Sequence, residues 1–258
     1  MRSCMKIIRI VPLLLAYLLI SCSIAFLPAG SRLRRILHTK NTSFFSRMML
    51  SLLGVNVHIN REWLPTLSSG SLIVSNHTSY IDILVIASLT PAVFITSVEL
   101  GSTLFLGMLA RFGGSLFVER RKPFGLKREI AMIARAIAEG FTVVLFPEGT
   151  TSNGERIQPF KKSLFDAAVM AGVDIRPICL RYTKINGGAL TVHNRGCVFY
   201  YGGDTFFRHF PKFSLLKSVD VVVIPLKSIK VPEHASRKEL ALAAHAAISS
   251  AYDNPLNV

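Results

Sequence analysis

The chain has 258 residues, half of them hydrophobic, and its mean hydropathy is +0.44. Lys and Arg number 30 against 15 Asp and Glu, so the formal net charge is +15 at pH 7. A chain that is both basic and apolar favours an anionic membrane as its partner. Nucleic-acid readers are more polar and show a recognisable module, and the sequence contains none. The four cysteines have no short paired spacing, so neither a zinc site nor a disulfide framework is indicated.

The first 30 residues are predicted to form an N-terminal membrane anchor. Residues 10–27 carry no charge, and these 18 positions are long enough to be a candidate membrane span. Three basic residues precede the stretch and five follow it before residue 48, so the positive-inside rule leans toward a cytoplasmic main domain.

Two alternatives to a retained anchor stay open. The basic start and the apolar centre also fit a signal peptide that is cleaved. In addition, the tetrapeptide ending at Cys22 resembles a lipobox, which would attach a lipid to Cys22 of an exported protein. The strongly basic flank beyond residue 30 favours the retained anchor.

Residues 31–54 are predicted to contain a second helix. Phe44, Phe45, Met48 and Met49 recur at spacings that form an apolar helix face. This face would either lie in the membrane interface or pack against the rest of the protein.

Residues 55–258 are predicted to form one α/β domain. Apolar or alternating runs indicate strands at 55–59, 72–74, 92–96, 113–121, 141–146, 174–182, 190–201 and 219–224. Helical periodicity indicates helices at 83–87, 100–112, 126–137, 163–171 and 235–252. Because strands alternate with helices, we expect a mostly parallel central sheet flanked by helices. Pro177 lies within one predicted strand and indicates an edge strand or a bulge.

The heptapeptide from Asn76 to Asp82 lies on a turn between a buried strand and a helix, where α/β folds place reactive groups. Ser79 and Asp82 resemble a capping box with Ser79 as the N-cap. His77 precedes the helix, so the turn can bring its imidazole against the Asp82 carboxylate. A carboxylate on one ring nitrogen leaves the other free to take a proton, which activates an alcohol. The motif alone fits a polar turn with a satisfied histidine equally well.

Two further segments carry residues suited to an anion. The strand at 113–121 ends in basic residues, and an Arg at a strand end can hold a phosphate through two parallel hydrogen bonds. The strand at 141–146 runs into the turn 147–152, where Gly149 lets backbone N–H groups approach a phosphate. Each segment alone also fits an ordinary polar loop.

Four segments together resemble the glycerolipid acyltransferase family, which contains 1-acylglycerol-3-phosphate acyltransferase. They are residues 76–82, 114–120, 146–150 and 175–178, and they match in type and order over roughly residues 55 to 182. The first and third segments are the specific ones, and Arg176 departs from the apolar residue usual in the fourth. The resemblance implies a glycerol-phosphate acyltransferase-like fold for residues 55–258.

The resemblance also implies roles for single residues. His77 would be the general base and Asp82 the group that orients it. The residues that bind the acceptor would be Gly114, Phe117, Arg120, Glu148, Gly149 and Thr150. The acyl donor would be a thioester of coenzyme A or of acyl-carrier protein, and no metal or other cofactor would be needed.

The implied function is a membrane-associated O-acyltransferase of phospholipid biosynthesis, which moves a fatty acyl group to the free hydroxyl of a lysolipid. The expected acceptor is 1-acyl-sn-glycerol 3-phosphate and the expected product phosphatidic acid. The expected partners are membrane lipids, the lysolipid and the acyl donor, with no nucleic acid. The expected location is the bacterial inner membrane, with the catalytic domain on the cytoplasmic side.

Other acceptors and one other class of protein stay open. Residues 146–165 and 201–204 also resemble a bacterial subgroup that includes acyltransferases for lyso-ornithine lipid. Glu99 departs from the basic residue frequent thereabouts in lysophosphatidate enzymes. Lyso-ornithine lipid or another lysophospholipid is therefore the alternative acceptor, and a non-catalytic exported lipoprotein with the same fold is the alternative class.

Overall fold

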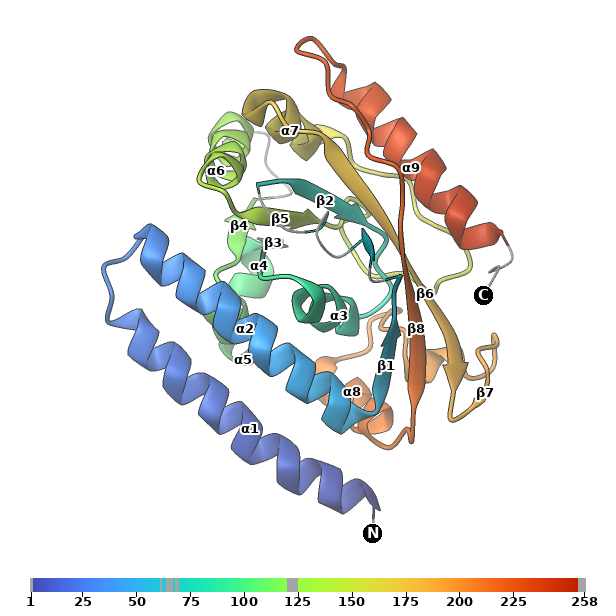
Figure 1. Ribbon diagram of the computed structural model, residues 1–258. Coiled ribbons are helices and arrows are strands. Elements are labelled where there is room, and N and C mark those ends of the chain that lie inside the picture. Colours follow the sequence, from blue (N-terminus) through green and yellow to red (C-terminus); the bar gives the residue numbers. More distant parts are fainter. Residues whose placement is uncertain (1, 61, 64–66, 68–69, 120–124, 255–258) are drawn as a thin grey trace.

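A computed structural model of the chain describes residues 2–60, 62–63, 67, 70–119 and 125–254 (Figure 1). Within these ranges the chain forms one sheet with strand order β1-β8-β6-β2-β5-β3-β4, and β7 pairs with β6. Neighbouring strands are parallel, except that β6 is antiparallel to both β8 and β7. The strands are β1 Val55–His58, β2 Leu72–Ser75, β3 Ala92–Ser97, β4 Leu116–Val118, β5 Thr142–Leu145, β6 Ile175–Ile185, β7 Gly188–Ala189 and β8 Val219–Pro225. The predicted α/β class with a mostly parallel sheet is confirmed.

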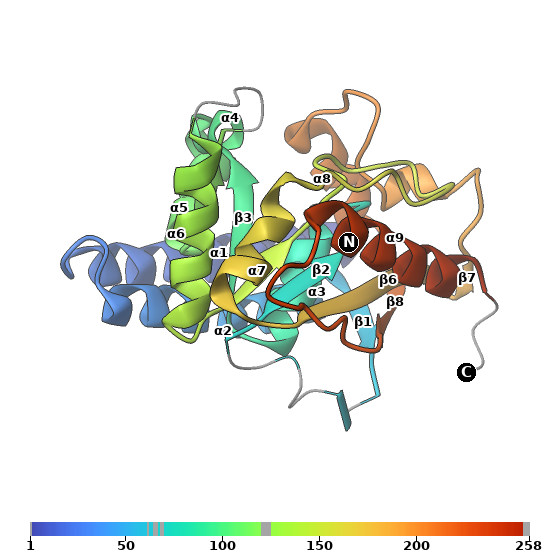
Figure 2. The same cartoon turned by 90° about the horizontal axis from the view of Figure 1, so that it is seen from above.

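Helices cover both faces of this sheet (Figure 2). On one face lie α1 Arg2–Ala25, α2 Arg32–Leu53, α3 Ile81–Leu89 and α8 Phe206–Ser214. On the other lie α6 Leu126–Ala138, α7 Asp166–Ala171 and α9 Arg237–Asp253. Two shorter helices, α4 Val98–Gly101 and α5 Leu104–Phe112, connect β3 to β4.

Each central strand divides its side chains between two cores. In β2, Ile73 packs on the α3 side, whereas Leu72 and Val74 pack on the α6 side. In β5, Val144 joins the first core and Val143 the second. This alternation explains why both strands appear in the sequence as continuous apolar runs, because a strand covered on both faces has no polar side.

Helices α1 and α2 form an antiparallel pair in which α2 lies between α1 and α3 (Figure 1). Tyr17 and Thr42 share a hydrogen bond of 3.2 Å between their hydroxyl oxygens, and Asn41 Nδ2 donates to Ser21 Oγ at 2.9 Å. The stretch Ile8–Ala25 is long and apolar enough to cross a membrane. Cys22 lies exposed near the end of α1.

Three expectations about single elements were wrong. Residues 190–201 form turns around a short 3-10 helix, Arg195–Cys197, rather than a strand. Residues 100–112 form two helices rather than one, because Thr103 caps α5 by accepting a hydrogen bond from Gly107 N. Strand β6, which contains Pro177, is internal to the sheet rather than an edge, and the irregularity in its register lies between Tyr182 and Lys184 rather than at Pro177. Pro177 has no N–H to donate, and its nitrogen lies on the side of β6 that faces Leu226, just past the end of β8 at Pro225. Leu226 N still donates to Pro177 O there.

Candidate active site

The heptapeptide and the 147–152 turn meet at the carboxyl ends of two adjacent parallel strands. Val74 of β2 is paired with Leu145 of β5 in the register. The chain leaves β2 toward α3 on one face of the sheet, and it leaves β5 toward α7 on the other face. Ligands of open α/β sheets bind where successive connections diverge in this way, so the topology marks this edge as a site.

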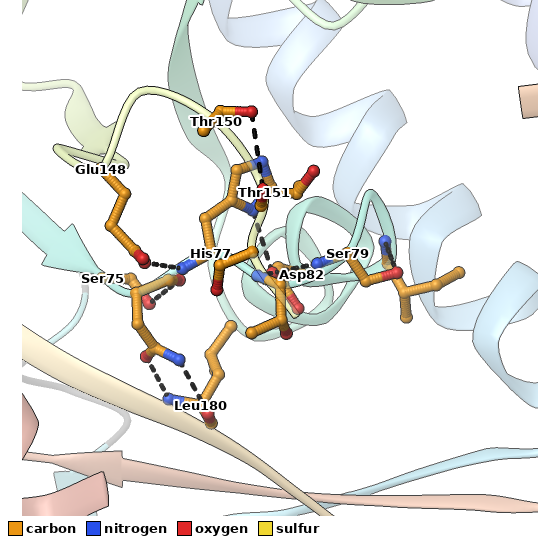
Figure 3. A network of polar contacts seen from close by, with 12 residues as sticks. Ser75, His77, Ser79, Asp82, Glu148, Thr150, Thr151 and Leu180 are labelled. Carbon is orange, nitrogen blue, oxygen red and sulfur yellow. Dashed lines mark hydrogen bonds and ion pairs between the residues drawn. The ribbon is translucent and has the colours of Figure 1, made fainter. Parts of the chain in front are cut away.

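His77 and Asp82 are in contact, as the turn allows (Figure 3). His77 Nδ1 lies 2.9 Å from Asp82 Oδ2, and the same oxygen accepts hydrogen bonds from Thr78 N at 2.7 Å and Ser79 N at 2.9 Å. The Asp82 side chain is fully buried. Its carboxylate thus orients the imidazole and at the same time satisfies the backbone N–H groups that precede α3.

The predicted N-cap is displaced by one residue. Helix α3 begins at Ile81, and Tyr80 occupies the N-cap position without a capping side chain. Half of the capping box is nevertheless formed, because Asp82 reaches back to Ser79 N.

Tyr182 of β6 is the fourth donor to Asp82, and the sequence analysis did not identify it. Its hydroxyl donates to Asp82 Oδ1 at 2.6 Å. Burial raises the pKa of this phenol well above its usual value, and the Asp82 charge raises it further. A signal was available, since a tyrosine in a buried strand needs a partner for its hydroxyl. The two residues are 100 positions apart in the sequence, so the sequence does not indicate that Asp82 is this partner.

The His77 ring leaves one nitrogen for a substrate. The ring stacks on Phe146 with centroids 4.0 Å apart, so both the carboxylate and the phenyl ring fix its orientation. Because Asp82 only accepts hydrogen bonds, Nδ1 carries the hydrogen and Nε2 holds the lone pair. No described residue hydrogen-bonds to Nε2, and 15% of the side chain is exposed.

Glu148 braces this turn from the other side (Figure 3). Its Oε1 accepts from His77 N at 2.6 Å and its Oε2 accepts from Gln158 N at 2.9 Å. Only 4% of the residue is exposed, and this burial raises its pKa to about 7, against the lowering effect of the two backbone hydrogen bonds. Each carboxylate oxygen of Glu148 therefore accepts one hydrogen bond from the protein backbone, and the predicted contact of Glu148 with the acceptor stays a prediction.

Gly149 and Thr150 continue the turn into solvent. Gly149 has φ +76°, and a Cβ built on it would lie 2.6 Å from Lys161 Nζ. The Lys161 ammonium therefore lies against the predicted acceptor turn. Thr150 is exposed, and among the described residues its hydroxyl makes one long contact, 3.5 Å to Thr151 O.

Of the other predicted acceptor residues, the two that the structure describes contact elements other than the His77 turn. Gly114 precedes β4 and lies against α2, with an ideal Cβ 3.6 Å from Thr39 Cγ2. Phe117, within β4, lies under the Arg111 guanidinium at 5.3 Å from the ring centroid. Arg120 lies outside the described residues.

Backbone contacts hold the His77 turn to distant segments. Asn76, fully buried, donates from Nδ2 to Leu180 O at 3.0 Å and accepts from Leu180 N at Oδ1 at 2.8 Å. Ser152 N donates to His77 O, and Tyr200 N donates to Thr78 O. The turn is therefore preorganised by β6 and by the loops that follow β5 and the 3-10 helix.

Comparison with known proteins gives consistent results. The sequence profile of the Acyltransferase family matches residues 54–181. A lyso-ornithine lipid O-acyltransferase from Rhizobium meliloti is 33% identical over 75% of this chain and 68% of its own length. A 1-acyl-sn-glycerol-3-phosphate acyltransferase from Neisseria meningitidis is 34% identical over 55% of each chain. The crystal structure of the 1-acyl-sn-glycerophosphate (LPA) acyltransferase PlsC from Thermotoga maritima covers 96% of both chains with a TM-score of 0.61 and 19% identity, so it supports the fold.

Proposed function

The chain belongs to the acyltransferase family, and on this premise we propose that His77 is its general base in acyl transfer to the hydroxyl of a lysolipid. One observation carries the proposal: Nδ1 of His77 is held by a buried carboxylate, while Nε2 has no protein partner among the described residues. A nitrogen of this kind can take a proton from an alcohol.

The chemistry follows from this arrangement. Nε2 removes the proton of the acceptor hydroxyl as its oxygen attacks the carbonyl carbon of the thioester. The C–S bond then breaks, the ester forms, and the leaving thiolate takes the proton back from His77. Asp82 stabilises the imidazolium that exists between these steps and keeps the ring in one orientation. The donor is a thioester of coenzyme A or of acyl-carrier protein, and the mechanism uses no other cofactor.

Both acceptors predicted from the sequence belong to the proposal. Lyso-ornithine lipid is favoured because three relatives named for it, at 29–33% identity, align with 75–81% of this chain. 1-Acyl-sn-glycerol 3-phosphate is supported by the Neisseria relative, which aligns with 55%. The turn at half-buried Gly149 and exposed Thr150, with Lys161 beside it, is the part of the site that would meet the phosphate or carboxylate of the acceptor headgroup.

We place the enzyme at a membrane, since its relatives use lipid acceptors and α1 contains an apolar stretch of 18 residues. Residues 1–30 serve as the anchor and residues 31–54 pack it on the acyltransferase domain, residues 55–258. The inner membrane and a cytoplasmic catalytic domain are the finer form of this proposal, argued from the basic residues that flank α1.

The test uses purified full-length protein, oleoyl-CoA and a panel of lysolipids, with products identified by mass. His77→Ala should lose about 10²–10⁴-fold in rate, the usual contribution of a positioned base. Asp82→Asn should give a folded but slower enzyme, because an amide can fix the wrong tautomer of His77. Circular dichroism checks the fold of each variant. Near wild-type transfer by folded His77→Ala protein would remove His77 from the mechanism.

A further inference from the structure

A groove between α1 and α2 lies apart from the His77 turn. Its volume is about 660 Å³, and its lining includes Arg9 and Leu13 from α1 and Arg47, Met48 and Leu52 from α2. None of the residues that line it belongs to the acyl-transfer site. The groove is open to solvent, and it combines an apolar floor with two guanidinium groups.

The register of the two helices places the two guanidinium groups within about one helical turn of each other along the helix axes. Tyr17 lies beside Thr42, and Ser21 lies beside Asn41. Counting back along both helices sets Arg47 opposite Leu13, about one helical turn or 6 Å from Arg9. The apolar stretch Ile8–Ala25 begins at the level of Arg9. The two arginines thus lie near the start of the apolar stretch, and the groove floor lies between their levels, with Leu52 close to the level of Arg9 and Met48 close to that of Leu13.

The positive charge of the groove is not neutralised by the protein. Arg47 Nη1 donates to Ser43 Oγ and to Ser88 O, each at 3.1 Å, which steadies the guanidinium and leaves its other donors available. No described acidic residue pairs with Arg9 or Arg47. The first 61 residues of the sequence contain nine Lys and Arg but no Asp or Glu. An anion is therefore the missing partner of this groove.

We propose that the groove binds one phospholipid that carries an anionic headgroup. Arg9 and Arg47 hold the phosphate, because a guanidinium matches phosphate oxygens with two parallel hydrogen bonds. One acyl chain lies along Leu13, Met48 and Leu52. A free phosphate would leave this apolar floor uncovered, so the groove fits a lipid rather than the inorganic ion. The site is independent of the acyl acceptor and of the role of His77.

Native mass spectrometry of the full chain in detergent tests the proposal, with phosphatidylglycerol and phosphatidylcholine as probes. Wild-type protein should retain one phosphatidylglycerol and prefer it to phosphatidylcholine. The double variant Arg9→Gln with Arg47→Gln should bind phosphatidylglycerol at least about tenfold more weakly, the minimum expected for losing charged hydrogen bonds. The matched control, Lys40→Gln with Arg208→Gln, removes the same charge from exposed positions outside the groove and should bind as wild type does.

A second variant keeps the test decisive if the double variant does not fold. Met48→Trp fills the groove but leaves both arginines, so it should also lose the bound lipid. The proposal is overturned if either folded variant retains phosphatidylglycerol at wild-type affinity, if phosphatidylcholine binds equally well, or if millimolar inorganic phosphate displaces the lipid. Lipid binding is read without any acyl transfer, so either result leaves the role of His77 to its own test.

Discussion

At the scale of single residues, the Asp82 carboxylate connects three separate parts of the chain. Its two oxygens accept four hydrogen bonds: from the His77 ring, from two backbone N–H groups ahead of α3, and from the Tyr182 hydroxyl of β6. A buried carboxylate is costly unless its lone pairs are satisfied, and here they are. Orientation of His77 therefore depends on groups that never contact a substrate.

Tyr182 is a positioning residue in this network, and Tyr182→Phe should test that role. Loss of one hydrogen bond to a charged group costs about 1.5–3 kcal/mol, so kcat should fall roughly tenfold or more if the carboxylate then moves. KM for the acyl donor should not change, because the Tyr182 side chain is buried and its hydroxyl contacts Asp82 rather than a substrate. Steady-state kinetics separates the two constants.

Tyr17→Phe is the matched control for this change. It also removes a buried phenol hydroxyl, one that bonds Thr42 between α1 and α2, and should leave kcat unaltered. If Tyr182→Phe lowered thermal stability by the same amount as Tyr17→Phe but kept the wild-type kcat, Tyr182 would be a purely structural residue.

Glu148 predicts a pH dependence of stability. Its pKa is raised from 4.5 to about 7 by burial, so between these values the unfolded chain has lost the proton that the folded chain still binds. The free energy of unfolding should therefore fall as pH rises from about 4.5 to 7, by at most about 3 kcal/mol, and should change no further above that range.

Glu148→Gln should remove this fall, since the amide does not titrate. Thermal unfolding at pH 5 and pH 8 gives the loss of stability for each protein, and the difference between wild type and variant is the contribution of Glu148. Asp174→Asn is the control, because Lys230 lowers the pKa of Asp174 and its transition lies below the tested range. A wild-type protein that lost no more stability than Glu148→Gln between pH 5 and 8 would contradict the prediction.

At the scale of elements, the sequence predicted the strands and turns that are determined by residues close together in the chain. The continuous apolar runs of β2 and β5 and the turn at His77 are examples. Residues 190–201 were wrongly predicted to be a strand because Val198 and Phe199 are apolar and buried. They follow a 3-10 helix, and their burial depends on contacts with distant segments. The sequence also did not predict that β6 is an internal strand. Pro177 is tolerated there because β8 ends beside it, which depends on the strand order of the sheet.

Asn76 joins two strand segments and should matter to stability. Asn76→Ala would leave the N–H and the C=O of Leu180 without partners in the sheet interior. Each unsatisfied buried group costs about 1–3 kcal/mol, so the free energy of unfolding should drop by roughly 2–5 kcal/mol. Asn56→Ala, which removes an exposed hydrogen bond to Asp220, is the control and should cost little. Equal melting temperatures for the two variants would show that the Asn76 bridge does not support the sheet.

At the scale of the whole molecule, the α1–α2 pair is tied to the domain at both ends. Lys6 Nζ donates to Leu53 O and to Leu216 O, at 2.9 and 2.6 Å. At the other end, Arg32 Nε donates to Glu139 O and Arg35 pairs with the Glu139 carboxylate at 3.2 Å. Helices α1 and α2 and the rest of the protein are thus joined by specific contacts. If the protein binds a membrane as proposed, both an apolar surface and a basic one should contribute to that binding.

Removal of residues 1–30 should separate these two contributions to membrane binding. The full chain exposes apolar side chains along α1, including Ile8, Val11, Leu15 and Leu19, which salt does not screen. The truncated chain loses three basic residues, so its formal charge falls only from +15 to +12. It should still bind anionic vesicles at low ionic strength but be released at 1 M salt, where the Debye length is about 3 Å. Vesicle sedimentation at both salt concentrations measures this, with circular dichroism as the check on folding. Truncated protein that stays on the vesicles at 1 M salt would show that the apolar contact lies elsewhere in the molecule.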